Sequence, residues 1–125
     1  MSIELFKLTN KVALVTGATS GMGKAIAQAL GAHGAKIAIA SNDENACFET
    51  EKEFAQIGIT AKAFVFDAVD KDSIHDLAQN VKEHFGTIDI LVSCVGIGPV
   101  VPFMEIDSKL YNTVMGINLQ SSIYL

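Results

Sequence analysis

The sequence predicts an α/β fold in which helices cover both faces of a parallel β-sheet of about four strands. Short apolar segments of strand length alternate with longer segments of helical apolar periodicity, and no linker, repeat or low-complexity tract separates them. One of the short segments, Lys36–Ala40, is apolar on both faces, as a strand inside a parallel sheet requires. Of the 125 residues 50% are hydrophobic and 18% charged, so we expect one folded domain over residues 1–125.

The first strand and helix are the most clearly marked elements. A strand is expected over Lys11–Thr16 and a helix over Met22–His33, and Gly34 ends the helix. The apolar residues at helical spacing, which we expect on the face toward the sheet, are Met22, Ile26, Ala29, Leu30 and His33.

The next elements repeat this order. Lys36–Ala40 predicts the second strand and Ala61–Phe66 the third. Between them a helix is expected over Asp43–Ile57, and Gly58 closes it. The apolar stripe of this helix consists of Cys47, Thr50, Phe54 and Ile57.

The remaining elements have clear end signals. Asp70 caps a helix that stops at Gly86, and Ile88–Cys94 predicts the fourth strand. After the loop Val95–Ile106, Asp107 caps a last helix. The expected apolar faces of the two helices are Ile74, Leu77, Ala78, Val81 and Phe85 in the first, and Leu110, Val114, Ile117 and Ser121 in the second. Right-handed crossovers favour the strand order 3-2-1-4, with a ligand crevice at the carboxyl ends of strands 1 and 4.

Composition and charge exclude several function classes. The net charge is −5 and no basic stretch occurs, so a nucleic-acid surface is not expected. The longest uncharged segment, Ile90–Met104, is short and interrupted by Pro99 and Pro102, and no signal-peptide pattern is present, so we expect no membrane span and a cytoplasmic protein. Cys47 and Cys94 match no metal or redox spacing, so we interpret them as buried free thiols and expect no metal.

A glycine-rich segment, Thr16–Gly23, joins the first strand to the first helix. Gly17 permits a sharp turn, Gly21 a close approach of backbone to a pyrophosphate, and Gly23 tight packing of the helix on the sheet. The helix that follows directs unpaired N–H groups and a partial positive charge at a bound phosphate. This strand–turn–helix context favours a dinucleotide site over a chance cluster of turn glycines.

The spacing Thr-Gly-x-x-x-Gly-x-Gly resembles the short-chain dehydrogenase/reductase family. The resemblance implies a Rossmann-type, doubly wound sheet that binds NAD(P), of which this chain is the N-terminal part. It implies hydride transfer between the nicotinamide and a small carbonyl or alcohol substrate. The cofactor-binding residues that it implies are Gly17, Thr19, Ser20, Gly21, Met22, Gly23, Ser41, Asn42, Asp67, Ala68, Cys94, Val95 and Gly96.

The choice between the two coenzymes depends on the residues after the second strand. Family members often carry Asp at the position of Ser41 to hold the ribose of NAD, or Arg at the position of Asn42 to bind the extra phosphate of NADP. This chain has neither, and Ser20 stands where NADP-dependent members often have Arg or Lys. Because no carboxylate occupies position 41 and Ser41 and Asn42 can donate hydrogen bonds, we favour NADP(H) over NAD(H) by a small margin. Ordinary turn and helix-start chemistry explains Asn42 and Asp43 equally well.

Two further positions match the family. Asp67 corresponds to the carboxylate that accepts a hydrogen bond from the adenine amino group, although capping a turn is the alternative. The fourth strand ends in Ser93-Cys94-Val95-Gly96, where the family has Asn-Asn-Ala-Gly, so only Gly96 is retained. Ser93 and Cys94 therefore replace two amides that in the family line the nicotinamide ribose site.

Asn118 corresponds to the Asn of the family's catalytic tetrad, which holds a helix kink; a solvated Asn without chemistry is the alternative. The family's Ser and Tyr-x-x-x-Lys lie after this Asn and have no counterpart here, since Tyr111 is followed by Met115 at the fourth place and Tyr124 stands next to the end. His33, His75 and His84 fall on helices expected far from the crevice. We therefore expect residues 1–125 alone to be inactive.

The last helix and the fourth strand predict an association surface. The fourth strand is apolar and has an open edge in the expected order. Further apolar residues on the last helix are Ile117, Leu119, Ile123 and Leu125. We therefore expect a homo-oligomer. The functional alternative to an oxidoreductase is a stand-alone nucleotide-binding or oligomerising module without redox activity.

Overall fold

The computed structural model describes residues 3–125; Met1 and Ser2, which the expected domain includes, lie outside the described residues. Four parallel strands form one sheet in the order β3-β2-β1-β4, so the expected fold class and the strand order 3-2-1-4 are confirmed. The strands are β1 (Val12–Thr16), β2 (Lys36–Ser41), β3 (Ala61–Val65) and β4 (Ile90–Ser93). The α-helices are α1 (Gly21–Ala32), α2 (Glu44–Gln56), α3 (Lys71–Phe85), α4 (Ser108–Met115) and α5 (Ser121–Tyr124).

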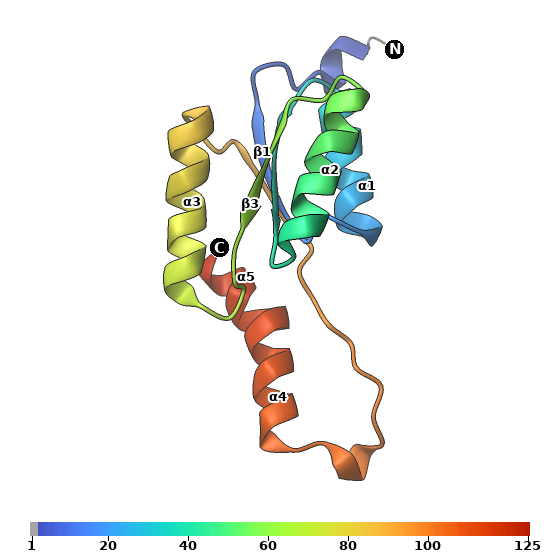
Figure 1. The fold of residues 1–125 in the computed structure, drawn as a ribbon, viewed down its shortest axis with the longest axis vertical. Helices are drawn as coiled ribbons and strands as arrows, with labels where there is room; N and C mark the ends of the chain where they lie inside the picture. Colours follow the sequence, from blue (N-terminus) through green and yellow to red (C-terminus); the bar gives the residue numbers. More distant parts are fainter. Residues whose placement is uncertain (1–2) are drawn as a thin grey trace.

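Two hydrophobic cores lie on opposite faces of the sheet, with α1 and α2 on one side and α3 and α5 on the other (Figure 1). All of β1 is buried, and its side chains alternate between the two cores. The first core joins Val15 and Ile39 to Phe54 of α2, and the second joins Leu14 to Leu77 of α3. This double burial explains why the central strands are apolar on both faces.

The buried face of α1 differs from the expected one. Met22 is 79% exposed and Ile26 36% exposed, so the predicted stripe is wrong at these two positions, whereas Leu30 packs against the first core as predicted. The residues that face the sheet are small, namely Gly23, Ala27 and Gly31. A Cβ on Gly31 would lie 2.5 Å from Cγ2 of Ile59, so the backbone of α1 lies directly against its neighbours. Small residues allow this close approach, and the larger side chains of Met22 and Ile26 are left on the outer surface.

The last helix is also different from the expected one, because it is not continuous. A π-helical segment, η3 (Gly116–Gln120), separates α4 from α5. Asp107 caps α4 as expected, by accepting a hydrogen bond from the amide of Leu110. No residue of α4 is buried, and this helix extends away from the sheet together with the loop before it, which contains the short 3-10 helix η2 (Phe103–Glu105) (Figure 1).

The sheet has two edges in the described part of the chain, and they differ in what satisfies their unpaired backbone groups. β4 pairs with β1 alone, so its outer edge is open as the sequence predicts, and Leu91 on it is 45% exposed. At the other edge, the carboxylate of Glu51 in α2 accepts a hydrogen bond from the amide of Ala63 in β3, with Oε2 2.6 Å from the nitrogen. A side chain thus satisfies an edge N–H that strand pairing leaves free.

We predict that Glu51→Ala lowers the free energy of unfolding by about 2 kcal/mol, because it leaves the partly buried amide of Ala63 without an acceptor. Glu51→Gln keeps a side-chain acceptor and is expected to lose less than about 1 kcal/mol. Urea denaturation of the purified protein measures both. The control is Glu49→Ala on the same helix, at an exposed position, and an equal loss there would contradict a role for the edge hydrogen bond.

Candidate functional site

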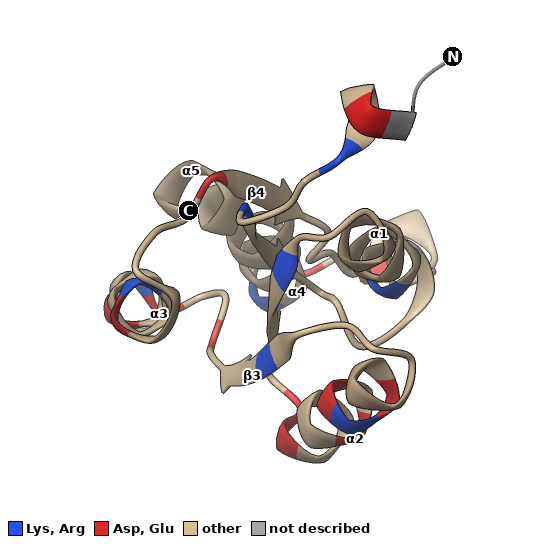
Figure 2. Cartoon of the chain, turned by 90° about the horizontal axis from the view of Figure 1, so that it is seen from above, with Lys and Arg blue, Asp and Glu red and all other residues tan. Residues whose placement is uncertain are grey.

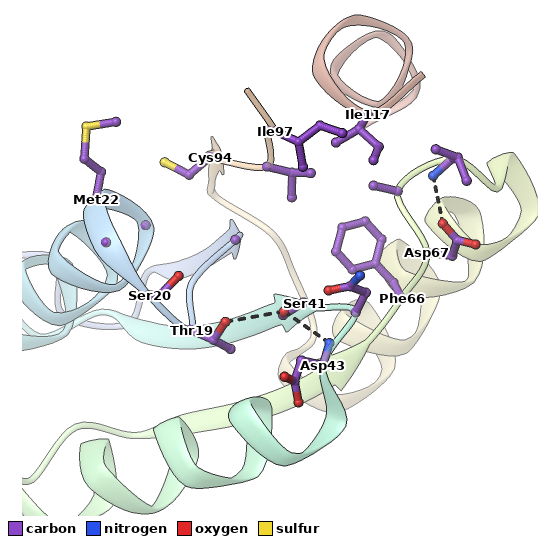
Figure 3. A pocket seen from close by; sticks show the side chains of 18 of the residues that line it. Thr19, Ser20, Met22, Ser41, Asp43, Phe66, Asp67, Cys94, Ile97 and Ile117 are labelled. Atoms are coloured by element: carbon purple, nitrogen blue, oxygen red, sulfur yellow. Dashed lines mark hydrogen bonds between the residues drawn. The ribbon is translucent and has the colours of Figure 1, made fainter. Parts of the chain in front are cut away.

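A large cleft lies at the carboxyl ends of the strands, at the switch point between β1 and β4 (Figure 3). Its volume is about 810 Å³, within the range of roughly 300–1,000 Å³ that is usual for ligand pockets. Each of the four strands contributes residues at or just after its end, as expected for an open parallel sheet. The cofactor-binding positions predicted from the sequence all lie in its lining: Gly17, Thr19, Ser20, Gly21, Met22, Gly23, Ser41, Asn42, Asp67, Ala68, Cys94, Val95 and Gly96.

The glycine-rich turn forms the floor of this cleft by close backbone packing. Gly17 has φ +67°, and a Cβ on it would lie 2.8 Å from the carbonyl oxygen of Cys94. A Cβ on Gly23 would lie 2.0 Å from the carbonyl oxygen of Gly17. Gly21 also has a positive φ of +53°, but no atom lies within 4 Å of the position of its Cβ. Gly17 and Gly23 therefore permit tight packing, whereas Gly21 leaves open space above the turn.

The N-terminus of α1 is the part of the cleft best suited to an anion. Ser20 occupies the N-cap position, but its side chain makes no capping hydrogen bond. In contrast, Asp43, Asp70 and Asp107 cap α2, α3 and α4 with side-chain acceptors. The first N–H groups of α1 lie at the open space above Gly21. A diphosphate fits this position, because unpaired amides and the positive end of the helix dipole both favour negative charge.

A chain of hydrogen bonds forms the wall at the end of β2 (Figure 3). The Ser41 hydroxyl oxygen accepts from the hydroxyl of Thr19, at 3.4 Å, and from the amide of Asp43, at 3.3 Å. Ser41 is only 8% exposed. The carboxylate of Asp43 accepts from the amide of Ala46 at 3.0 Å, so it starts α2 and lines the cleft at the same time. The turn chemistry proposed for Asp43 from the sequence is therefore present.

Asp67 lines the cleft after β3 and takes part in a local turn. Its Oδ1 accepts a hydrogen bond from the amide of Val69 at 3.0 Å, and its own amide donates to the hydroxyl of Ser73 at 2.8 Å. The turn that the sequence offers as the alternative for this residue is thus present. The contact with an adenine amino group stays a prediction, since the carboxylate retains further acceptor positions.

The two cysteines have different environments. Cys47 is buried as expected, its thiol lies 3.8 Å from the carbonyl oxygens of Ser41 and Phe64, and desolvation by burial raises the pKa of this thiol. Cys94 is only partly buried and lines the cleft, so the expectation of a buried thiol is wrong there. Its position directly after β4 explains the difference, because the ends of the strands open into the cleft.

Asn118 does not line the cleft; it fixes the loop that does. Its amide nitrogen donates to the carbonyl oxygen of Ile97 at 2.7 Å, and its Oδ1 accepts from the amide of Ile97 at 2.8 Å. The Asn lies within the π-helical segment η3, and such segments are frequent at functional sites. The side chain of Asn118 is thus exposed to solvent and also hydrogen-bonded to a specific partner, and its place in a catalytic tetrad stays a prediction.

Some residues of the lining were not predicted from the sequence. Asp43 was weighed between a turn or helix start and a contact with the coenzyme, and Phe66 follows β3 directly, so both positions carry a readable signal. The lining residues from the loop after β4, from α4 and from η3 have no such signal. Their position in the cleft depends on how α4, η3 and α5 pack against the rest of the fold. The unpredicted members are Asp43, Phe66, Val69, Ile97, Asn112, Thr113 and Ile117.

The described residues 3–125 contain neither a candidate membrane span nor a candidate metal cluster. No helix in this range is long and apolar enough to span a bilayer. No group of three or more His, Cys, Asp or Glu side chains within it is arranged to hold a metal ion. The three histidines are absent from the cleft lining.

The chain is similar to known dehydrogenases over nearly its whole length. The family model described as short chain dehydrogenase matches residues 11–125. The chain is 40% identical over 119 residues to galactitol 2-dehydrogenase of Agrobacterium fabrum, with 95% of this chain and 45% of the relative covered. It is 39% identical over 124 residues to D-threitol dehydrogenase of Mycolicibacterium smegmatis, with 96% of this chain and 46% of the relative covered.

A crystal structure of an actinorhodin polyketide ketoreductase with NADPH has a TM-score of 0.88 to this chain at 32% identity. The match covers 91% of this chain and 44% of that one. The chain therefore spans about half the length of the relatives that it matches.

We predict that Gly23→Ala lowers the free energy of unfolding by about 3 kcal/mol, because the new methyl group overlaps the carbonyl oxygen of Gly17. The control is Gly58→Ala, at a positive φ of +80° with no atom near the position of its Cβ, which is expected to cost about 1 kcal/mol of backbone strain. Thermal and urea denaturation measure both changes. Equal losses for the two variants would contradict the close packing described here.

We predict that Asn118→Ala releases the loop after β4, since both hydrogen bonds to Ile97 are lost. Hydrogen–deuterium exchange at the Ile97 amide is expected to be about tenfold faster or more. Gln120→Ala serves as the control, because Gln120 lies in the same π-helical segment and its side chain donates to Tyr124 instead. Unchanged protection of Ile97 in Asn118→Ala would show that the loop is held by other contacts.

Proposed function

The chain belongs to the short-chain dehydrogenase family, and we propose that the whole protein is an oxidoreductase that uses a nicotinamide dinucleotide coenzyme. The observation that carries this proposal is the uncapped N-terminus of α1 above the glycine-rich turn, in a cleft at the switch point of the sheet. The protein that resembles this chain and is described with NADPH supports the same coenzyme class. Family membership supports a redox role over that of a binding module without chemistry.

We assign a binding role to each wall of the cleft. The first amides of α1, above Gly21, hold the diphosphate. The wall of Ser41 and Asp43 receives the adenosine ribose, and Asp67 receives the adenine. The loop at Gly96, which Asn118 holds through Ile97, borders the nicotinamide side. A bound nicotinamide coenzyme supplies or accepts a hydride, and these residues orient it.

The substrate that we propose is a small alcohol or carbonyl compound. The names of two relatives, galactitol 2-dehydrogenase and D-threitol dehydrogenase, support polyhydroxy alcohols and their ketones as the first class to examine. In the family that the chain resembles, proton transfer is carried out by a Ser and a Tyr-x-x-x-Lys motif that lie after the position of Asn118. Residues 1–125 do not contain them. The activity is therefore proposed for the whole protein, and inactivity of residues 1–125 alone stays a prediction.

The proposal extends to association, location and the form of the coenzyme. Association into a homo-oligomer is favoured by exposed Leu119 and Ile123 near the end of the described chain, which are 50% and 70% exposed. A cytoplasmic location also stays a prediction. The margin in favour of NADP(H) depended on the donor capacity of Ser41 and Asn42. Ser41 is buried and already hydrogen-bonded, so this reason is weaker in the structure than in the sequence.

We predict that the whole protein is stabilised by millimolar NADH or NADPH and oxidises a polyol or reduces its ketone, and that Gly21→Arg abolishes both properties. An arginine side chain at this position fills the open space above the turn and excludes the diphosphate. The shift in melting temperature with coenzyme measures binding, and absorbance of the reduced coenzyme measures turnover.

The matched control for this variant is Gly58→Arg. Gly58 also has a positive φ and open space around its Cβ position, but it lies outside the cleft lining, so it reproduces the backbone strain alone. Coenzyme binding that survives in Gly21→Arg would contradict the assigned diphosphate position. A whole protein that responds to neither coenzyme would contradict the proposed function.

A further inference from the structure

We propose that Asp43 is the specificity-determining residue of the cleft and that it selects NAD(H) over NADP(H). The inference rests on the proposed function, because it concerns which form of the coenzyme the assigned ribose wall accepts. The two forms differ only by a phosphate on the 2′-hydroxyl of the adenosine ribose. The charges and hydrogen-bond capacities at the end of β2 therefore decide between them.

The charges on the cleft oppose a second anionic group. Among the described lining residues there are two carboxylates, Asp43 and Asp67, and no Lys, Arg or His. The lysine that follows the glycine-rich turn, Lys24, is paired with Glu53 of α2, with Nζ 2.5 Å from Oε2. The ribose phosphate of NADP(H) thus finds no cation to pair with in the lining. Repulsion between the ribose phosphate and these carboxylates is strongest in low salt, because few ions then screen it.

The surroundings of Asp43 add to this negative charge. The helix that Asp43 starts, α2, carries Glu44 in its first turn, and acidic side chains predominate along it (Figure 2). No basic residue occurs between Ser41 and Glu51, so nothing on this segment offsets the carboxylate. The wall is therefore electrostatically suited to a neutral ribose.

The hydrogen-bond capacity of the wall points the same way. The Ser41 oxygen already accepts from Thr19 and from the Asp43 amide, so only its own hydroxyl proton is available to a ligand. A phosphate needs several donors, and the wall adds only the Asn42 side-chain amide to the Ser41 proton, whereas a ribose 2′-hydroxyl donates a proton and needs an acceptor. The Asp43 carboxylate is such an acceptor, since its bond to Ala46 uses Oδ1 and leaves further acceptor positions.

The position of Asp43 explains why the sequence favoured the other coenzyme. In the family that the chain resembles, the acidic residue often stands at position 41, directly at the end of β2. Here the carboxylate comes two residues later, at the N-cap of α2, and the hydrogen bond to Ala46 fixes it at the rim of the same cleft. A cap and a selectivity residue are thus combined in one side chain.

The test is a fluorescence titration of the whole protein with NADH and with NADPH, at about 20 mM and about 500 mM salt. We expect NADH to bind about tenfold more tightly or better at low salt, and the ratio to fall as salt screens the repulsion. Asp43→Asn keeps a capping side chain and removes the charge. In this variant NADPH binding is expected to improve about threefold or more, and the ratio to depend less on salt, since Asp67 and Glu44 remain.

Asp70→Asn is the matched control. Asp70 caps α3 with the same chemistry but lies outside the cleft lining, and we expect its replacement to leave the NADH-to-NADPH ratio unchanged. Equal or tighter binding of NADPH by the unmodified protein would overturn the inference while supporting the coenzyme site. A ratio in Asp43→Asn equal to that in Asp70→Asn would also overturn it. Binding of neither nucleotide would instead contradict the proposed function itself.

Discussion

The contact between the N-terminus of α1 and the end of β1 is the constraint on which the rest of the structure depends. The carbonyl oxygen of Gly17 occupies the space that a side chain at Gly23 would need, so the helix begins directly above the strand. The same contact extends along α1 to Gly31, which lies against Ile59. Close packing of this helix sets the depth of the cleft, and it aims the first amides of the helix at the space above Gly21.

The glycine pattern of the sequence predicted the turn between β1 and α1 and the cleft above it. The buried face of α1 was not predicted. Apolar periodicity selected Met22 and Ile26, because in most helices large apolar side chains face the core. Here Gly23 and Ala27 face it, since a contact between backbones excludes larger residues. The stripe of α3 was predicted correctly because Ile74, Leu77 and Val81 pack by the usual rule of large side chains in a core.

The end of the chain was less predictable for a different reason. A π-helical segment has no clear sequence signal, so one helix was expected where α4, η3 and α5 are found. The insertion turns Asn118 toward the loop after β4, where its amide fits both the N–H and the C=O of Ile97. The loop residues of the lining, such as Ile97, take their place from this contact between distant segments. Spacing along the chain therefore could not identify them.

Helix capping distinguishes the N-terminus of α1 from those of α2, α3 and α4. An Asp side chain at the N-cap of α2, α3 and α4 satisfies early amides and places a negative charge at each of these three termini. Such ends repel an anionic ligand. At α1 the cap is Ser20, which contributes neither a charge nor a side-chain hydrogen bond. The N-terminus of α1 lies at one side of the cleft and Asp43 at another. The two sides therefore favour different parts of a ligand: anionic groups at α1, and neutral groups that donate hydrogen bonds at α2.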